Sequence, residues 1–525
     1  MLDRRQFLKL SVAGAGTLAL PLWCLAQEGM PTADPAAALK LDWTSKFNWS
    51  NVVDITRMPG NNWHEKLAAA QAAVIAKGQG KGGVVFFPAG SYEFTDHVKI
   101  KDGIVLRGAD PKVITKAHEE RYDPPSKLEF PKYKPIFEGD GTPTSTAFKG
   151  IYLENPAAGG NTGLVNLAIN RGHIHLLESE DHKCQPNRIV FGCSLRNAAV
   201  AEPNVPKLDI GQLAWQRFTQ RHHAAIDVVA DHNILIANNR LPKSGDDNFA
   251  MMGYIVAAGK GKTEKLDGII FDYDNRPGLY INHFCVGGSG GSGNDGTPES
   301  HPYGFRKGIV IRDNYVYNSG RMGIGFTGDG TLVANNIIRI PDNIWRPSVT
   351  GTDYSRGSST NDNRAIEMRG WRWTLDGNDY IVHRNIAADR KYKINDGEGL
   401  MHEDHCNSTI VDSKLINNRG NTYLSIYKCG PIDGLLVEGN DIRLGDGRQT
   451  IANGTAIFVV ADRNSGKQPI KNVSIINNTT AAGGIKIGGN PAENCIVKGN
   501  KHVGGGGKII NEANAKVENN QGYEA

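Results

Sequence analysis

A short strand-like phrase recurs along the chain. Each copy alternates apolar or small residues with residues that project the other way, as in Ile366-Glu367-Met368-Arg369-Gly370. A turn follows, and then a second apolar run that ends in Asn or a similar residue. The copies begin at Ile151, Ile174, Ile226, Leu279, Ile324, Ile366, Leu400, Leu424, Ile457 and Ile485. Strand repeats with no helix between them predict a solenoid of parallel strands, a parallel β-helix.

The repeat runs through most of the chain, so we expect an all-β fold with one solenoid domain over residues 51–525. A solenoid lengthens in one direction, and its length does not force a division into further domains. The 63 glycines suit this fold, because each coil needs several turns and glycine enters positive φ without steric cost. Adjacent Asn-Asn pairs such as 477–478 and 519–520 mark turns whose side-chain amides bridge neighbouring coils.

A helix and two strands precede the repeats. Asn62 begins an alanine-rich stretch that ends at Gly78, which predicts a helix with an N-cap and a C-terminal glycine. Gly83-Val-Val-Phe-Phe-Pro-Ala-Gly-Ser-Tyr92 then reads as strand, turn and strand. This helix and phrase resemble the N-terminal entry of the pectate-lyase-like superfamily. The resemblance implies a single-stranded right-handed parallel β-helix whose open end is capped by the helix, and it leaves the reaction open.

The first residues have the pattern of an export signal. Asp3-Arg4-Arg5-Gln6-Phe7-Leu8-Lys9 resembles the twin-arginine motif, and an apolar stretch from Leu10 to Leu22 follows it. Small residues before Gln27 offer a cleavage site. We therefore expect a signal peptide at 1–26, a lead-in or linker at 27–50, no membrane span, and a bacterial protein that is periplasmic or secreted.

Uneven spacing between the copies predicts long loops. A bare coil of a β-helix needs little more than twenty residues, and the excess is largest between about 200 and 365. We expect long loops at about 201–224, 241–278, 284–307 and 341–364. Long loops on a rigid scaffold are where binding residues usually lie, so these segments are candidate walls of a cleft.

Alignment of the copies places a group of polar residues on one outer face. Positions two and four of each phrase point outward if the apolar positions point inward. The predicted catalytic residues are Glu367, Arg369, Glu403, Tyr427, His405, His402 and Asp404. Two glutamates on neighbouring coils can act as the carboxylate pair of a glycosidase, or an arginine and a base can serve a lyase. A ladder of surface ion pairs is the structural alternative.

Basic and aromatic residues surround this group, which favours an anionic polysaccharide as the substrate. The predicted substrate-binding residues are Arg364, Trp371, Lys428, Asn282 and Asp227. Asp272 and Asp274 stand on alternate positions and are weak candidates for Ca²⁺ ligands, although a turn is the commoner explanation. We expect no other cofactor, and the sequence leaves the oligomeric state open.

The net charge and the cysteine spacing do little to narrow the possible functions. The formal net charge of +4 gives no strong attraction to nucleic acid. Behind the predicted signal, the cysteines match no zinc pattern, and Cys406 and Cys429 stand close enough in the repeat to pair or simply to stack. The disulfide state stays open for Cys184, Cys193, Cys285, Cys406, Cys429 and Cys495.

Three functions fit these patterns. The favoured one is a polysaccharide lyase acting on a uronate-containing chain. The second is a glycoside hydrolase with Glu367 and Glu403 as its carboxylate pair. The third is a solenoid that binds glycans without catalysis.

Overall fold

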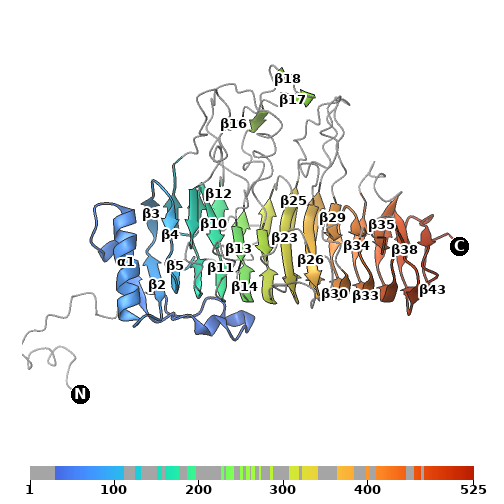
Figure 1. Ribbon diagram of the computed structural model, residues 1–525, viewed down its shortest axis with the longest axis horizontal. Coiled ribbons are helices and arrows are strands. Elements are labelled where there is room, and N and C mark those ends of the chain that lie inside the picture. Colours follow the sequence, from blue (N-terminus) through green and yellow to red (C-terminus); the bar gives the residue numbers. More distant parts are fainter. Residues whose placement is uncertain are drawn as a thin grey trace, which may run out of the picture.

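The computed structural model is a right-handed parallel β-helix with one long helix at its N-terminal end (Figure 1). It describes residues 30–111, 124–131, 151–155, 160–176, 186–196, 226–229, 232–241, 249–251, 256–259, 262–265, 271–273, 284–287, 307–317, 322–340, 364–382, 398–402, 409–427, 429–444, 454–462 and 466–524.

Three stacks of parallel strands form the walls of the β-helix, and the chain visits stack 1, stack 2 and stack 3 in turn. Stack 1 contains β4 (Val98–Lys99), β7 (Ile151–Glu154), β10 (Gly172–Leu176), β13 (Ile226–Val229), β20 (Phe284–Gly287), β23 (Met322–Asp329), β26 (Arg364–Trp371), β29 (Glu398–His402), β32 (Leu424–Ile426), β35 (Thr455–Val460), β38 (Gly484–Gly488) and β42 (Ile509–Asn511).

Stack 2 begins before stack 1 and includes the first strand of the fold. It contains β1 (Val52–Asp54), β2 (Gly83–Phe87), β5 (Ile104–Gly108), β8 (Thr162–Val165), β11 (Arg188–Phe191), β14 (His232–Ala237), β21 (Lys307–Arg312), β24 (Leu332–Ala334), β27 (Thr374–Asp376), β30 (Ile410–Ile416), β33 (Ile432–Glu438), β36 (Ile470–Ile476), β39 (Ala492–Glu493), β40 (Ile496–Lys498) and β43 (Lys516–Glu518).

Stack 3 closes each coil. It contains β3 (Gly90–Glu93), β6 (Ser126–Glu129), β9 (Ala168–Asn170), β12 (Ser194–Arg196), β15 (Arg240–Leu241), β22 (Tyr315–Tyr317), β25 (Ile337–Ile340), β28 (Asp379–Val382), β31 (Arg419–Gly420), β34 (Asp441–Arg443), β37 (Thr479–Ala481) and β41 (Lys501–Val503). Two antiparallel pairs lie outside the stacks, namely β16 (Phe249–Met251) with β19 (Phe271–Tyr273), and β17 (Val256–Gly259) with β18 (Lys262–Lys265).

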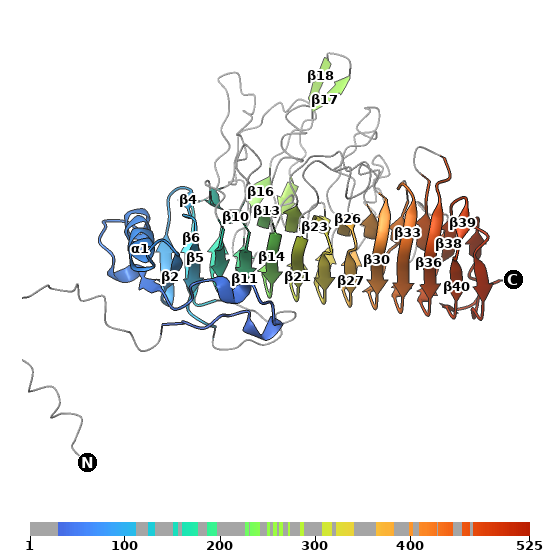
Figure 2. The same cartoon turned by 60° about the horizontal axis from the view of Figure 1, so that its bottom comes forward.

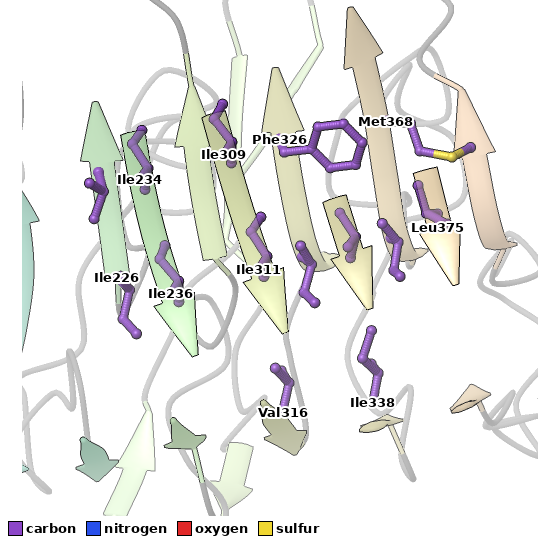
Figure 3. Close-up of a cluster of buried hydrophobic side chains, with 14 of the residues drawn as sticks. Ile226, Ile234, Ile236, Ile309, Ile311, Val316, Phe326, Ile338, Met368 and Leu375 are labelled. Carbon is purple, nitrogen blue, oxygen red and sulfur yellow. The ribbon is translucent and has the colours of Figure 1, made fainter. Parts of the chain in front are cut away.

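The interior is filled by the inward row of each stack. Figure 3 shows side chains from neighbouring coils lying in line, such as Ile234, Ile236, Ile309 and Ile311 from stack 2. All four are fully buried in one apolar cluster that runs through the β-helix. Alternation along each strand sends the residues between them to the outer face.

The helix predicted between Asn62 and Gly78 is α1 (Trp63–Lys77). The Asn62 side chain caps it by accepting a hydrogen bond from the Glu65 amide at 2.9 Å. Leu67, Ala70 and Val74 pack into the interior cluster at the N-terminal end of the coils (Figure 1). The helix therefore packs against the end of the interior cluster, while its role as a cap over open strand edges stays a prediction.

An asparagine ladder fixes the turn between stacks 2 and 3. Each member donates its backbone N–H and its side-chain Nδ2 to the side-chain Oδ1 of the next, as Asn378 does to Asn418 at 3.1 and 2.9 Å. The residue before each member is left-handed, for example Asn417 with φ of 55°. The ladder consists of Asn239, Asn314, Asn336, Asn378, Asn418, Asn440, Asn478, Asn500 and Asn520. The amide bridges predicted at the Asn-Asn turns are confirmed.

The lead-in segment packs against the outside of stack 2 as a strap. We use this name for residues 30–49, which include the short 3₁₀ helices η2 (Ala37–Leu39) and η3 (Thr44–Lys46) and precede a third, η4 (Ile55–Arg57). Trp43, Phe47 and Trp49 form a second buried apolar cluster with outward-facing residues of stack 2, which are Val84, Phe86, Val105, Val165, Ile189, Leu235 and Ala237. The strap follows the lower edge of the coils in Figure 2. The prediction of a linker is thus refined to a docked segment.

The ladder predicts a large difference between adjacent asparagines. Replacement of the fully buried Asn418 by Ala leaves buried polar groups of its neighbours without a partner, at about 1–3 kcal/mol for each group. We expect Asn418→Ala to lower the free energy of unfolding by at least that amount in denaturant titration. Asn417→Gly, at an exposed left-handed position, is the control and should stay near wild type. Equal losses of unfolding free energy in the two variants would contradict a special contribution of the asparagine ladder to stability.

The strap predicts a second stability effect. Phe47 is 4% exposed, and its removal from the outer apolar cluster should cost about 3–5 kcal/mol in Phe47→Ala. Ser45→Ala changes an exposed side chain in the same segment and should cost little. Thermal unfolding and binding of a hydrophobic dye would check this, and a wild-type melting curve for Phe47→Ala would show that the strap does not stabilise the coils.

Candidate functional site

The register of stack 1 is the foundation of the candidate site. Ile324, Ile366, Leu400 and Leu424 pair successively with one another, and Ile457 and Ile485 continue the inward row. This order confirms the alignment predicted from the repeats over these coils. The outward position beside this row is held successively by Gly325, Glu367, Met401, Ser425, Phe458 and Lys486.

Glu367 and Arg369 form an ion pair on the outer face of β26. Arg369 Nη2 donates to Glu367 Oε1 at 2.7 Å. Ile366 and Met368 on either side are part of the interior cluster, so alternation directs Glu367 outward. The Glu367 side chain is nevertheless only 3% exposed, whereas that of Arg369 is 29% exposed. The site therefore holds a shielded carboxylate beside a guanidinium that reaches solvent.

Tyr427 lies on the same outer face, C-terminal to the ion pair. It follows Ser425 by two residues, as Arg369 follows Glu367, and Ser425 is aligned with Glu367 through Met401. Its ring meets Phe458 edge to face, with centroids 5.8 Å apart. Both rings are half-buried.

Several predicted residues lie outside the described part of the chain. These are Glu403, Asp404, His405, Lys428, Asn282 and Asp274. The structure therefore leaves the proposed Glu367–Glu403 pair as a prediction.

For other predicted residues, only the position in the fold is described. His402 pairs with Met368 at the end of β29, and Arg364 begins β26 opposite Glu398. Asp227 pairs with His175 on one side and with Cys285 on the other. Asp272 lies in β19 opposite Ala250, away from the three stacks of the β-helix.

The tryptophans beside the ion pair do not offer exposed rings. Trp371 is 1% exposed, and Trp373 is fully buried in the interior cluster. This burial argues against Trp371 as a residue that stacks on a sugar. Arg372 next to it binds Asp329 through two hydrogen bonds of 2.7 and 2.5 Å. Some of the predicted basic and aromatic residues are thus buried or paired within the protein and do not face a ligand.

The register also differs from the predicted alignment in two coils. Leu153, not Ile151, lies in line with Ile174. The strand beside Ile226 begins at Phe284 instead of Leu279, and β20 takes the first residues of a predicted loop. At Ile151 the slip is two residues and keeps the same face inward, so periodicity alone could not find it. At Leu279 the shift is five residues, an odd number, so the predicted inward and outward faces are exchanged in β20.

The corrected register brings Glu154 into line with His175 and Asp227, which the repeat alignment already places in one row. Glu154 pairs with His175, and His175 pairs with Asp227. His175 and His173 are 7% and 0% exposed, and their rings lie 6.0 Å apart. In the sequence, the alternation in Gly172-His-Ile-His-Leu176 indicates that Ile174 points inward and the two histidines point outward. Once Ile174 is aligned with Leu153, His175 falls beside Glu154.

Among the described residues, neither thiols nor metal ligands add to the candidate site. Cys193, Cys429 and Cys495 carry free thiols, so Cys429 does not pair with Cys406 here. Burial raises the pKa of the Cys193 thiol to about 12, which keeps it protonated and inert at neutral pH. Within the described ranges, no three His, Cys, Asp or Glu side chains gather closely enough to hold a metal ion.

Comparison with family models gives no match, and comparison with curated proteins gives none either. Among solved structures, the catalytic unit of a thermostable GH87 α-1,3-glucanase from Streptomyces thermodiastaticus is 14% identical, with a TM-score of 0.41 over 91% of this chain and 69% of that chain. The surface adhesin PfbA of Streptococcus pneumoniae is 12% identical, with a TM-score of 0.39 over 90% of this chain and 92% of that chain.

A mannuronic-acid-specific polysaccharide family 6 lyase from human gut microbiota is 11% identical, with a TM-score of 0.37 over 82% of this chain and 77% of that chain. Similarities of this size carry no argument about the reaction. The fold rests on the strand pairing described above. Among the helices described, none has the length and apolar character needed to cross a membrane.

The ion pair predicts strong coupling between its members. Arg369→Met leaves the shielded Glu367 carboxylate without its guanidinium, which should cost about 3–5 kcal/mol of stability. Glu367→Gln with Arg369→Met should cost less than the sum of the single changes. A double-mutant cycle from denaturant titration measures this difference, and additive losses would show that the two side chains do not interact.

Proposed function

We propose that this protein is an exported enzyme that cleaves a polysaccharide at the outer face of stack 1. The observation that carries the proposal is the shielded Glu367 carboxylate with Arg369 at 2.7 Å. Taking a carboxylate out of water is costly even when it is paired, and such groups are concentrated at functional sites. The twin-arginine motif in the sequence supports export.

The connections of the chain support the same location. Stack 2 joins stack 3 through tight turns of the asparagine ladder. The chain between stack 3 and the next strand of stack 1 is much longer, as residues 197–225, 242–283, 341–363 and 383–397 show. Long connections on a rigid scaffold supply binding residues, and in the sequence two of these, 341–363 and 383–397, precede β26, which carries Glu367 and Arg369, and the next strand of stack 1.

We favour β-elimination on a uronate-containing chain. Arg369 would contact the uronate carboxylate and stabilise the negative charge that develops when the C5 proton leaves. Tyr427 or His405 would accept that proton. The C4–O bond would then break as the C4–C5 double bond forms, and an acid would protonate the departing oxygen. Glu367 would hold Arg369 in place, with His402 and Asp404 nearby.

A glycoside hydrolase is the second candidate. In this reaction Glu367 would be the nucleophile or the base, and Glu403 would be the acid. The two reactions give different products, because elimination leaves a double bond that absorbs in the near ultraviolet and hydrolysis does not.

The proposal predicts a specific loss in Glu367→Gln. We expect cleavage of the polymer to fall by about 10²–10⁴-fold if Glu367 takes part in proton transfer or nucleophilic attack, and by less if it only positions Arg369. The assay follows ultraviolet absorbance and reducing ends together on acidic and neutral polysaccharides. Glu438→Gln, on the outer side of stack 2, is the matched control and should keep full activity.

A folded Glu367→Gln variant with wild-type activity would remove this residue from the reaction. Binding of a polymer by the wild-type protein with no cleavage on any substrate would instead indicate a glycan-binding solenoid.

A further inference from the structure

A second group of side chains continues the outer face beyond Tyr427. The Lys486 ammonium lies 5.5 Å from the centroid of the Phe458 ring and 2.8 Å from Glu512 Oε1. The Phe458 ring in turn meets Tyr427 edge to face. These four residues come from neighbouring coils of stack 1 and form a connected aromatic and charged cluster.

A glycine without a side chain lies beside the cluster. The outward row that contains Tyr427 continues with Val460 and then Gly488, which has no side chain. A Cβ atom on Gly488 would lie 3.2 Å from Val460 Cγ1 and 3.5 Å from Glu512 Oε2. The Glu512 carboxylate therefore lies over the glycine, in the space that a larger residue would fill.

The ion pair of this cluster is open to exchange. The Lys486 side chain is 21% exposed and that of Glu512 is 40% exposed. Exposed pairs of this kind contribute about 0–1 kcal/mol, so another carboxylate can replace Glu512 on the ammonium at little cost. The Glu367 side chain is only 3% exposed, so a ligand carboxylate cannot replace it on Arg369 in the same way.

The distance between the cluster and Glu367 suits an extended polymer. Phe458 is three coils from Glu367 in the same outward row, and Lys486 is four coils away. At ~4.8 Å for each coil, these steps correspond to roughly 14 and 19 Å. A polymer lying along the stack can reach both places at once, whereas a single sugar ring cannot.

We propose that Phe458 and Lys486 form a binding subsite for a uronate ring of the polymer, with the Phe458 ring held edge to face by Tyr427. The Lys486 ammonium takes the sugar carboxylate in exchange for Glu512, and the Phe458 ring packs against the apolar face of the sugar. Glu512 acts as an internal carboxylate that occupies the subsite when no polymer is bound. This proposal rests on the proposed function, because it presumes a polymer that extends along stack 1.

The test uses opposite changes at the two charges. Lys486→Met should weaken the binding of sodium polygalacturonate or sodium alginate by about tenfold, the effect of one lost charge-assisted hydrogen bond. Glu512→Gln should strengthen it, because the competing carboxylate is gone. Calorimetric titration in a Glu367→Gln background measures binding without turnover. Lys471→Met is the matched control, since Lys471 pairs with Glu493 at 3.3 Å on stack 2.

Three outcomes would overturn the subsite. Unchanged binding in both variants would mean that Lys486 and Glu512 form only a surface ion pair. Weaker binding in both would mean that Glu512 helps to hold the sugar instead of competing with it. Equal effects on neutral dextran would remove the uronate carboxylate from the recognition. Loss of proposed activity is a separate result, because a protein that cleaves no polymer can still show the opposite shifts in affinity.

Discussion

The constraint on which this structure depends is the pairing of polar groups between successive coils. An interior filled with isoleucine, leucine and valine leaves no water to satisfy backbone amides, so each coil must bind the next in a fixed register. The asparagine ladder extends this pairing to side chains at the turn between stacks 2 and 3. Every outward side chain then has a set place relative to those on the coils beside it.

That fixed spacing is what makes a site possible from residues distant in the chain. Glu367, Ser425, Phe458 and Lys486 share one outward row because their inward neighbours are aligned. The charges on this face are largely balanced within the described residues, since Arg369 pairs with Glu367, Arg372 with Asp329, and Lys486 with Glu512. For these three pairs, binding of an acidic polymer would require an exchange of partners.

The fold and most of the register follow from the sequence because they depend on local signals. Alternation identifies the inward positions from Ile324 to Ile485, and Asn62 and Gly78 mark the ends of α1. The offset near Ile151 could not be found in this way, because a slip of two residues keeps the same face inward. Only pairing with a neighbouring coil distinguishes the two choices, and that information is not local.

Burial on the outer face is also a property of the assembled molecule. Glu367 and Trp371 have sequence patterns of outward or strand-end residues, yet both are almost fully covered. Likewise, Val84, Leu235 and their neighbours make stack 2 apolar on both sides, which a pattern alone cannot assign to a covering segment. For the strap that covers them, composition leaves a lead-in and a linker open, because its three large aromatic residues are spread among polar ones.

The strap has a consequence for the order of assembly during synthesis. Its residues leave the ribosome before the rest of the domain, but its apolar cluster reaches Leu235 and Ala237 in β14 and touches Val310 in β21. The apolar surface on which the strap packs is thus complete only after some three hundred residues have been made. Contacts so far apart in the chain form slowly, because loop closure must come first. The strap is therefore among the last parts of the N-terminal half of the molecule to reach its final packing.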